Sequence, residues 1–252
     1  MNRKNFVMVV LAAAAGVVPT VVRAAQPCPP PLVTVSGGTS ATTNCPAATG
    51  SSYSTTFSSK EKPINEGGMW VNGKSTGGKW NDVQTIVGRA YGTALMDVER
   101  YADNVAHLTT SFTANQYAQG TVYRVPGYMN PSDAHEIELL LRFKITPGNA
   151  RGYEVLWAQD GGVCVVRWNG PLSDYNLLSD GCPLIGKAVD GDVLRAEITG
   201  STIKVYKNGA LVVTASDSSA RWNDGQPGMG FWPCPGATID AYGWKAFQAG
   251  SL

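Results

Sequence analysis

The chain has 252 residues, with 20 Lys and Arg against 19 Asp and Glu, and 29 glycines. A balance this close to neutral, with no basic cluster after the N-terminus, makes nucleic acid an unfavourable partner and leaves an uncharged or mildly charged polymer such as a polysaccharide. Glycine and small polar residues are frequent, and helix formers do not recur at helical spacing. This composition favours many short strands.

Residues 1–24 have the parts of a secretory signal peptide. Arg3 and Lys4 precede an apolar run over 6–18, and small residues near position 24 offer a cleavage site. The run is too short to span a bilayer, and Pro19 interrupts it. We expect a secreted or periplasmic protein without a membrane span. Removal of this segment changes the charge balance to 17 against 19, a net charge of −2.

Residues 25–52 are rich in Pro, Thr and Ser and are predicted to form a linker. Such a composition buries too little apolar surface to pack by itself. Cys28 and Cys45 lie at its two ends, and export permits disulfides, so we expect these two cysteines to pair. The folded domain is predicted to cover 53–252, an ordinary size for one all-β domain.

The other three cysteines leave the pairing open. Cys182 is predicted to bond to Cys164, in an apolar strand, or to Cys234, in a loop between two prolines. No C-x-x-C spacing supports a metal site.

Alternating or apolar runs bounded by Gly, Pro, Asn or Asp predict strands along the whole domain. The predicted strands cover 82–87, 89–94, 104–110, 118–125, 136–145, 152–159, 163–168, 174–178, 227–232 and 238–247, with a short helical turn near 94–102.

The clearest passage is GDVLRAEITGSTIKVYKNGALVV, residues 191–213. Leu194, Ala196 and Ile198 alternate with polar residues, which predicts a half-buried strand. A turn at 199–201 and the type I′ dipeptide Asn208-Gly209 then predict a three-stranded meander.

This meander, followed by GQPGMGFW (225–232) and DAYGWKAF (240–247), resembles the C-terminal half of concanavalin A-like lectin/glucanase and laminin G-type domains. The passage 67–93 is similar to exported bacterial members of that superfamily. The resemblance covers most of 53–250 and implies an all-β, two-sheet antiparallel jelly-roll sandwich. It does not select a function, because lectins, glycosidases, lyases and non-catalytic modules share the fold.

The string HEIELLLRF, residues 135–143, is the first candidate site. On a strand, Glu136, Glu138 and Arg142 share one face, and the two carboxylates stand about 7 Å apart, close to the separation of acid/base pairs. We expect Glu154 and Arg167 to join this face from the next two strands.

The string also resembles the E-x-D-x-x-E strand of a glucanase family with this fold. It departs from that motif, because Glu138 takes the Asp place and Leu141 stands where the second catalytic Glu is expected. The alternative is a solvated strand face with cross-strand ion pairs.

Two further features have functional and structural interpretations. Trp80 and Trp222 lie in loop-like surroundings and are candidate exposed platforms for sugar rings, or simple loop-packing residues. Asp190 and Asp192 offer oxygen ligands to calcium, although Asp-Gly pairs are also common turn residues. No other cofactor is expected.

Three functions remain open. The first is a secreted carbohydrate-binding protein that recognises a polysaccharide on its concave sheet or loop rim through Arg142, Arg167, Trp80 and Trp222. The second is a polysaccharide lyase or glycoside hydrolase that uses Glu138 with Glu136 or Glu154. The third is a structural or adhesive exoprotein.

Overall fold

The computed structural model describes residues 50–94, 103–128, 135–233 and 237–252. The predicted signal peptide, the linker with Cys28 and Cys45, most of the predicted helical turn and Cys234 lie outside these residues and stay predictions. Among the described residues, no helix is both long and apolar enough to cross a membrane.

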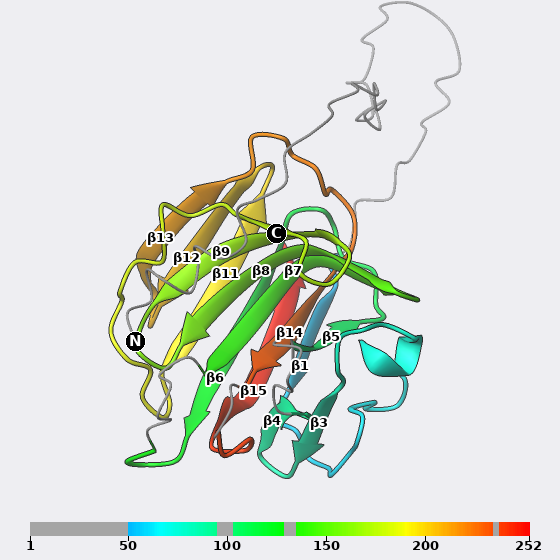
Figure 1. The fold of residues 1–252 in the computed structure, drawn as a ribbon, viewed down its shortest axis with the longest axis vertical. Helices are drawn as coiled ribbons and strands as arrows, with labels where there is room; N and C mark the ends of the chain where they lie inside the picture. Colours follow the sequence, from blue (N-terminus) through cyan, green and yellow to red (C-terminus); the bar gives the residue numbers. More distant parts are fainter. Residues whose placement is uncertain (1–49, 95–102, 129–134, 234–236) are drawn as a thin grey trace, which may run out of the picture. The chain divides into compact units, whose positions relative to one another are not determined.

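The described residues form two antiparallel sheets (Figure 1). Sheet A has the order β13-β12-β11-β6-β15-β4-β3, with β1 also paired to β15. Its strands are β1 (Ser52–Thr55), β3 (Val83–Ile86), β4 (Arg89–Gly92), β6 (Gln116–Arg124), β11 (Val193–Thr199), β12 (Thr202–Lys207), β13 (Ala210–Ser216) and β15 (Tyr242–Ser251).

Sheet B has the order β10-β9-β8-β7-β14-β5-β2. Its strands are β2 (Trp70–Asn72), β5 (Asn104–Leu108), β7 (Glu136–Thr146), β8 (Asn149–Ala158), β9 (Val163–Gly170), β10 (Tyr175–Leu177) and β14 (Gln226–Trp232). A single 3-10 turn, η3 (Lys74–Thr76), follows β2. The predicted all-β, two-sheet antiparallel jelly-roll sandwich is confirmed.

The core lies between the two sheets because alternate residues of each strand face the other sheet. Ile137, Leu139 and Leu141 of β7 are fully buried there with Leu194 and Ala196 of β11. We call this side of sheet B its inner face and the opposite side its outer face.

The outer face of sheet B carries a second apolar cluster. Its buried members on the strands include Val105, Leu140, Leu156 and Val166. Because sheet B is covered on both faces, most residues of β7, β8 and β9 are buried, including several polar ones.

The predicted meander over 191–213 is confirmed as β11, β12 and β13. Asn208 and Gly209 have φ angles of 50° and 82°, the left-handed values that a type I′ turn requires. A register shift between Val205 and Tyr206 was not predicted from the alternation. The short strands β1 and β2 were not predicted.

Candidate functional site

Three buried carboxylates, Asp103, Glu138 and Glu154, meet on the outer face of sheet B. One carboxylate oxygen from each residue lies within 4.8 Å of those of the other two. The exposed fractions of the three residues are 8%, 0% and 3%. Three acidic groups at this separation repel one another when ionised, so the cluster is costly to bury and is a candidate functional site.

The sheet register explains how residues distant in sequence meet. Glu138 and Leu140 share the outer face of β7, and Leu140 pairs with Glu154 of β8. Asp103 directly precedes β5 and, by alternation, lies on the same side as Val105.

Gly230 of β14 makes room for the meeting of these strands. It pairs with Glu138 on one side and with Val105 on the other. A Cβ atom at position 230 would lie 2.1 Å from Oε2 of Glu138. The absence of a side chain at this point therefore lets the Glu138 carboxylate lean over β14, towards the strand that Asp103 precedes.

The hydrogen bonding of the three carboxylates is unequal. Trp168 Nε1 donates to Oε2 of Glu154 at 2.7 Å. Both oxygens of Glu138 are buried and have no hydrogen-bond partner among the described residues. A carboxylate left unpartnered in a dry site is strongly disfavoured in its charged form.

The pKa values of all three groups are raised. Burial raises the pKa of Asp103 to about 7. Burial, followed by the charge of Asp103, raises the pKa of Glu154 to about 8. The pKa of Glu138 lies well above its ordinary value because of burial and the negative charges of Glu154, Asp103 and Glu136. The cluster therefore holds protons at neutral pH.

Aromatic rings border the acidic cluster. Trp80 and Trp168 are in edge contact with centroids 5.7 Å apart, and Trp168 lies 5.3 Å from Tyr175. Tyr175 pairs with Trp168 across β10 and β9 and is 38% exposed. We call Trp80, Trp168 and Tyr175 the aromatic row; it extends from the buried interior to the surface beside Glu154.

The predicted face of β7 forms only in part. Glu136 and Glu138 do point to the outer face, and Glu154 joins them, but Arg142 does not. The register with β8 shifts between Leu141 and Lys144, and Arg142 has a φ angle of 47°, so the alternation is broken there. The Arg142 guanidinium instead donates to the carbonyls of Ala114 and Trp222.

Arg167 also lies apart from the acidic cluster. Its strand neighbours Cys164, Val166 and Trp168 occupy the outer face, so Arg167 belongs to the other side. It forms an ion pair with Asp217 at 2.7 Å, and Asp217 also accepts a hydrogen bond from Tyr153. The predicted contribution of Arg167 to the carboxylate face is therefore wrong.

The two tryptophans predicted as exposed platforms have different surroundings. Trp80 is buried, with an exposed fraction of 1%, and its Nε1 has no hydrogen-bond partner in the described parts of the chain. Trp222 is half-buried between the guanidinium groups of Arg151 and Arg221, at 4.4 and 4.9 Å from its ring centroid, and donates to the carbonyl of Trp168. Of the two interpretations of Trp80, the exposed platform is therefore wrong, and the burial of its ring agrees with packing.

The predicted calcium ligands Asp190 and Asp192 are engaged within the chain. Asp190 accepts from the backbone N–H of Arg124 and pairs with Lys245 at 2.9 Å. Asp192 accepts from Asn208 at 2.9 Å and pairs with Lys207 at 3.4 Å. Their oxygens hold turns and strands together and do not converge on a common point with a third acidic residue of the described part.

The one disulfide among the described cysteines joins Cys164 and Cys182, with a Cα–Cα distance of 4.5 Å. Of the two pairings that the sequence left open for Cys182, this is the one observed. It ties the loop after β10 to the outer face of sheet B, where Cys164 is buried in the apolar cluster.

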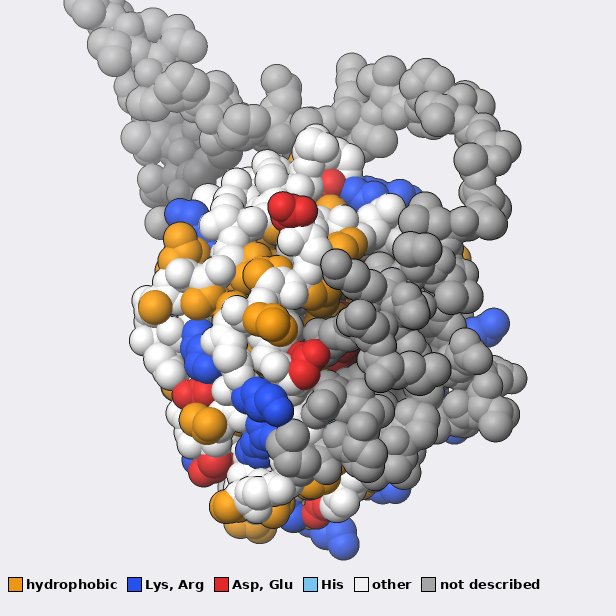
Figure 2. All heavy atoms as spheres, turned by 60° about the vertical axis from the view of Figure 1, so that its left-hand side comes forward, with side chains coloured by type: hydrophobic (Ala, Val, Ile, Leu, Met, Phe, Trp, Pro, Cys, Tyr) orange, Lys and Arg blue, Asp and Glu red, His pale blue; other side chains and the backbone are white. Residues whose placement is uncertain are grey.

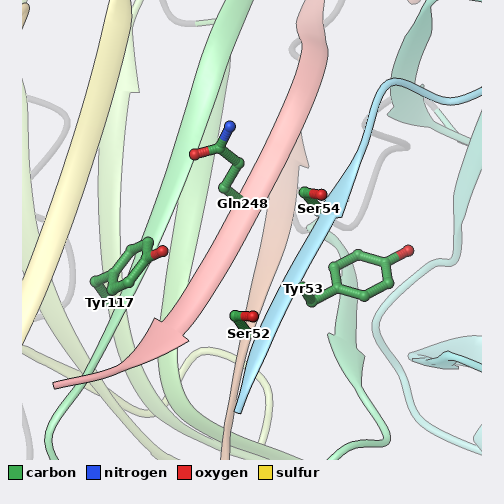
Figure 3. A pocket seen from close by; sticks show the side chains of 5 residues that line it. All are labelled: Ser52, Tyr53, Ser54, Tyr117 and Gln248. Atoms are coloured by element: carbon green, nitrogen blue, oxygen red, sulfur yellow. The ribbon is translucent and has the colours of Figure 1, made fainter. Parts of the chain in front are cut away.

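Two surface hollows lie away from the acidic cluster. One of about 330 Å³ is on sheet A, lined by Ser52, Tyr53, Ser54, Tyr117 and Gln248 (Figure 3). Another of about 310 Å³ includes Phe143 and Lys144 of β7, about 17 Å along the strand from Glu138 by strand geometry. On the face drawn in Figure 2, basic and acidic side chains are interspersed, and neither sign gathers into a large patch.

Sequence reasoning missed Asp103, Trp168, Tyr175 and Gly230. Asp103 directly precedes the predicted strand 104–110, and an acidic residue at the end of a strand was the one feature of the sequence that could have marked it as a candidate. The role of Gly230 depends on which strands flank β14, and the sequence does not reveal that.

No family model and no curated protein matches this chain. Several solved structures are similar to it at low identity. A carbohydrate-binding module from Bacillus subtilis is 15% identical, with a TM-score of 0.46 over 75% of this chain and 95% of that one. A β-glucanase from Bacillus licheniformis is 15% identical, with a TM-score of 0.42 over 80% and 95%.

An endo-β-galactosidase from Clostridium perfringens is 9% identical, with a TM-score of 0.46 over 79% of this chain and 62% of that one. These neighbours are concanavalin A-like jelly-roll proteins, the superfamily that the sequence resembles.

Proposed function

We propose that this chain is an exported glycan-processing protein whose acid/base centre is the cluster of Asp103, Glu138 and Glu154. The observation that carries the proposal is the meeting of three buried carboxylates, with oxygens within 4.8 Å, on one sheet face. A structural role does not require three acidic groups in mutual repulsion.

The protonation of the cluster suits cleavage of a glycosidic bond. Such cleavage needs one carboxylic acid that donates a proton to the leaving oxygen and one carboxylate that acts as nucleophile or base. Glu138, whose pKa is raised well above its ordinary value by burial and by neighbouring negative charges, is proposed as the acid. Asp103, whose pKa of about 7 is below that of Glu154, is proposed as the carboxylate that ionises first.

The separation of the carboxylates favours one stereochemical outcome. Retaining glycosidases hold their two carboxyl groups about 5–5.5 Å apart, whereas inverting enzymes need about 6.5–9.5 Å to admit a water molecule. The oxygens that face one another lie within 4.8 Å, which is closer to the separation in the first class. The groups come from three different elements, unlike the single-strand E-x-D-x-x-E arrangement.

The aromatic row supports a saccharide as the substrate. Sugar rings pack on aromatic faces through their apolar C–H surfaces. Tyr175 offers an exposed ring, and Trp168 connects it to Glu154 through a hydrogen bond. The absence of a basic cluster in the predicted mature chain agrees with a neutral or mildly charged glycan.

Export is part of the proposal. The sequence of residues 1–24 has the parts of a signal peptide. The Cys164–Cys182 disulfide is typical of proteins that fold in an oxidising compartment.

A second candidate is a carbohydrate-binding protein that does no chemistry. It is favoured by the complete burial of Glu138, which an acid catalyst must expose to its substrate at some stage. The two candidates differ in whether products form.

A panel of immobilised and soluble polysaccharides tests both candidates. Retention of the full chain is measured together with the release of reducing ends and of unsaturated products. The proposal predicts retention and reducing ends, with the products lost in Glu138→Gln and kept in Glu197→Gln, a matched change on sheet A. Retention without products in the wild-type chain supports the binding protein, and neither retention nor products overturns the glycan proposal.

A further inference from the structure

The acidic cluster has the donor set of a cation site as well as that of an acid/base centre. We propose that Asp103, Glu138 and Glu154 together bind one Ca²⁺ ion when they are deprotonated. The inference uses the same three residues as the proposed function, but it rests on their oxygens alone and not on any glycan.

The charge around the cluster is the first support. None of the ion pairs in the described parts of the chain includes any of the three carboxylates. The charged groups that act most strongly on Glu138 are all negative: Glu154, Asp103 and Glu136. A bound divalent cation supplies a positive charge that no ion pair among the described residues provides.

Glu138 is the second and separate support. Its side chain is fully buried, its two oxygens accept no hydrogen bond from any residue that the structure describes, and one of them lies within the 4.8 Å group. Buried acceptors without a donor are rare in folded proteins and need an explanation such as an ion. Gly230 keeps the space beside this carboxylate free of a side chain, so Glu138 is directed into the cluster rather than into packing.

The oxygen triangle has room for calcium. Its sides are at most 4.8 Å, so its centre lies at most about 2.8 Å from each corner, a limit that includes the usual Ca–O distance of about 2.3–2.6 Å. Magnesium is less favoured because it requires near-ideal octahedral geometry and gives up its water reluctantly. Oxygen donors without nitrogen or sulfur also favour calcium over zinc.

Protons and calcium compete for the same oxygens, because ligands must be deprotonated to bind a metal. Affinity for calcium is therefore expected to rise with pH through the range in which the cluster ionises. If the chain also uses Glu138 as an acid, the calcium-bound form is the inactive one.

The test is calcium binding to the full chain after treatment with EDTA and desalting, followed by titration calorimetry with CaCl₂ at pH 8 and pH 6. We expect one ion per chain at pH 8 and an affinity at least about tenfold lower at pH 6. The same titration with MgCl₂ should give weaker binding.

Three variants locate the site. Glu138→Gln and Asp103→Asn should each lower the calcium affinity at least about tenfold, because each removes a charged ligand. Asp190→Asn should leave it unchanged. Two cluster variants are used so that a failure of one to fold, judged by circular dichroism, leaves the other as a test.

No binding by the folded wild-type chain at millimolar calcium and pH 8 overturns the proposal. So does binding that both cluster variants retain, and so does binding that only Asp190→Asn removes. These outcomes say nothing against glycan processing, whose own test is product formation in the presence of EDTA.

Discussion

Replacement of Glu154 by Gln gives a prediction that can be worked out quantitatively. The amide has nearly the same shape as the carboxyl group, and its oxygen can still accept the hydrogen bond that Trp168 Nε1 donates. The substitution therefore removes the titration of the group and leaves most of the packing in place.

The raised pKa of Glu154 determines whether the free energy of unfolding rises or falls with pH. Below pH 4.5 both the folded and the unfolded chain hold the proton, so the group has no effect on the pH dependence. As the pH rises towards 8, the unfolded chain loses this proton and the folded chain keeps it. The free energy of unfolding then falls by about 1.4 kcal/mol per pH unit, or about 3 kcal/mol between pH 5 and pH 7.

Two buried histidines change the pH dependence of stability in the opposite direction. Burial lowers the pKa values of His107 and His135 to about 4, so the unfolded chain takes up protons below pH 6.5 and the folded chain does not. Their contribution makes stability rise up to about pH 6.5 and then stay constant. Between pH 6.5 and pH 8 the decline caused by the acidic cluster therefore appears without this opposing contribution.

The assay is urea unfolding of the wild-type chain and of Glu154→Gln at half-unit steps from pH 5 to pH 8, with EDTA present. The variant should gain stability relative to the wild type as the pH rises, by about 3 kcal/mol over two units as an upper estimate. Glu197→Gln serves as the matched control. A difference between wild type and Glu154→Gln that does not change with pH would refute the raised pKa and with it the protonated cluster.

Three further predictions concern stability. Cys182→Ser removes the disulfide to Cys164, which closes an 18-residue loop. The loss should lower the free energy of unfolding by about 3 kcal/mol, the value that the chain-entropy description gives for a loop of this length, and urea unfolding measures it. Gly230→Ala places a Cβ atom against the carboxylate of Glu138. It should lower the free energy of unfolding by about 1–3 kcal/mol and also abolish calcium binding. A loss of stability with calcium binding intact would contradict the role given to this glycine. At Asp217, the hydrogen bonds that its carboxylate accepts outweigh burial and lower its pKa to about 2. The ionised group therefore contributes stability above pH 3.8, and this contribution is lost as the pH falls towards 2. In Asp217→Asn, the free energy of unfolding should change less with pH over that range, which urea unfolding at several pH values measures.

Much of the fold was predictable because local rules agree with it. Nearly every described strand longer than four residues falls on a predicted one, since two-residue periodicity and turn dipeptides such as Asn208-Gly209 act over short distances. The same periodicity correctly placed Glu138 and Glu154 on the outer face. It failed at Arg142, because a bulge that depends on the partner strand reverses the side on which later residues lie.

The third member of the acidic cluster, Asp103, could not be predicted from such local patterns. Asp103 reaches Glu138 only because β14 separates β5 from β7 and carries Gly230 at the crossing point. Strand order is a long-range property that composition and spacing do not contain. The burial of Trp80 has the same origin, because its loop neighbours indicated a surface position while Trp168 of the distant β9 lies against it.

The central claim is that three carboxyl groups on the outer face of sheet B share protons at neutral pH. A carbon-13 NMR titration of the Asp and Glu side-chain carboxyls of the full chain, with EDTA present, tests it most directly. The account predicts a coupled set of carboxyls that titrates in steps around pH 7 and 8 or above and is altered in both Glu138→Gln and Glu154→Gln. Titration of every carboxyl group below about pH 5 would contradict the account.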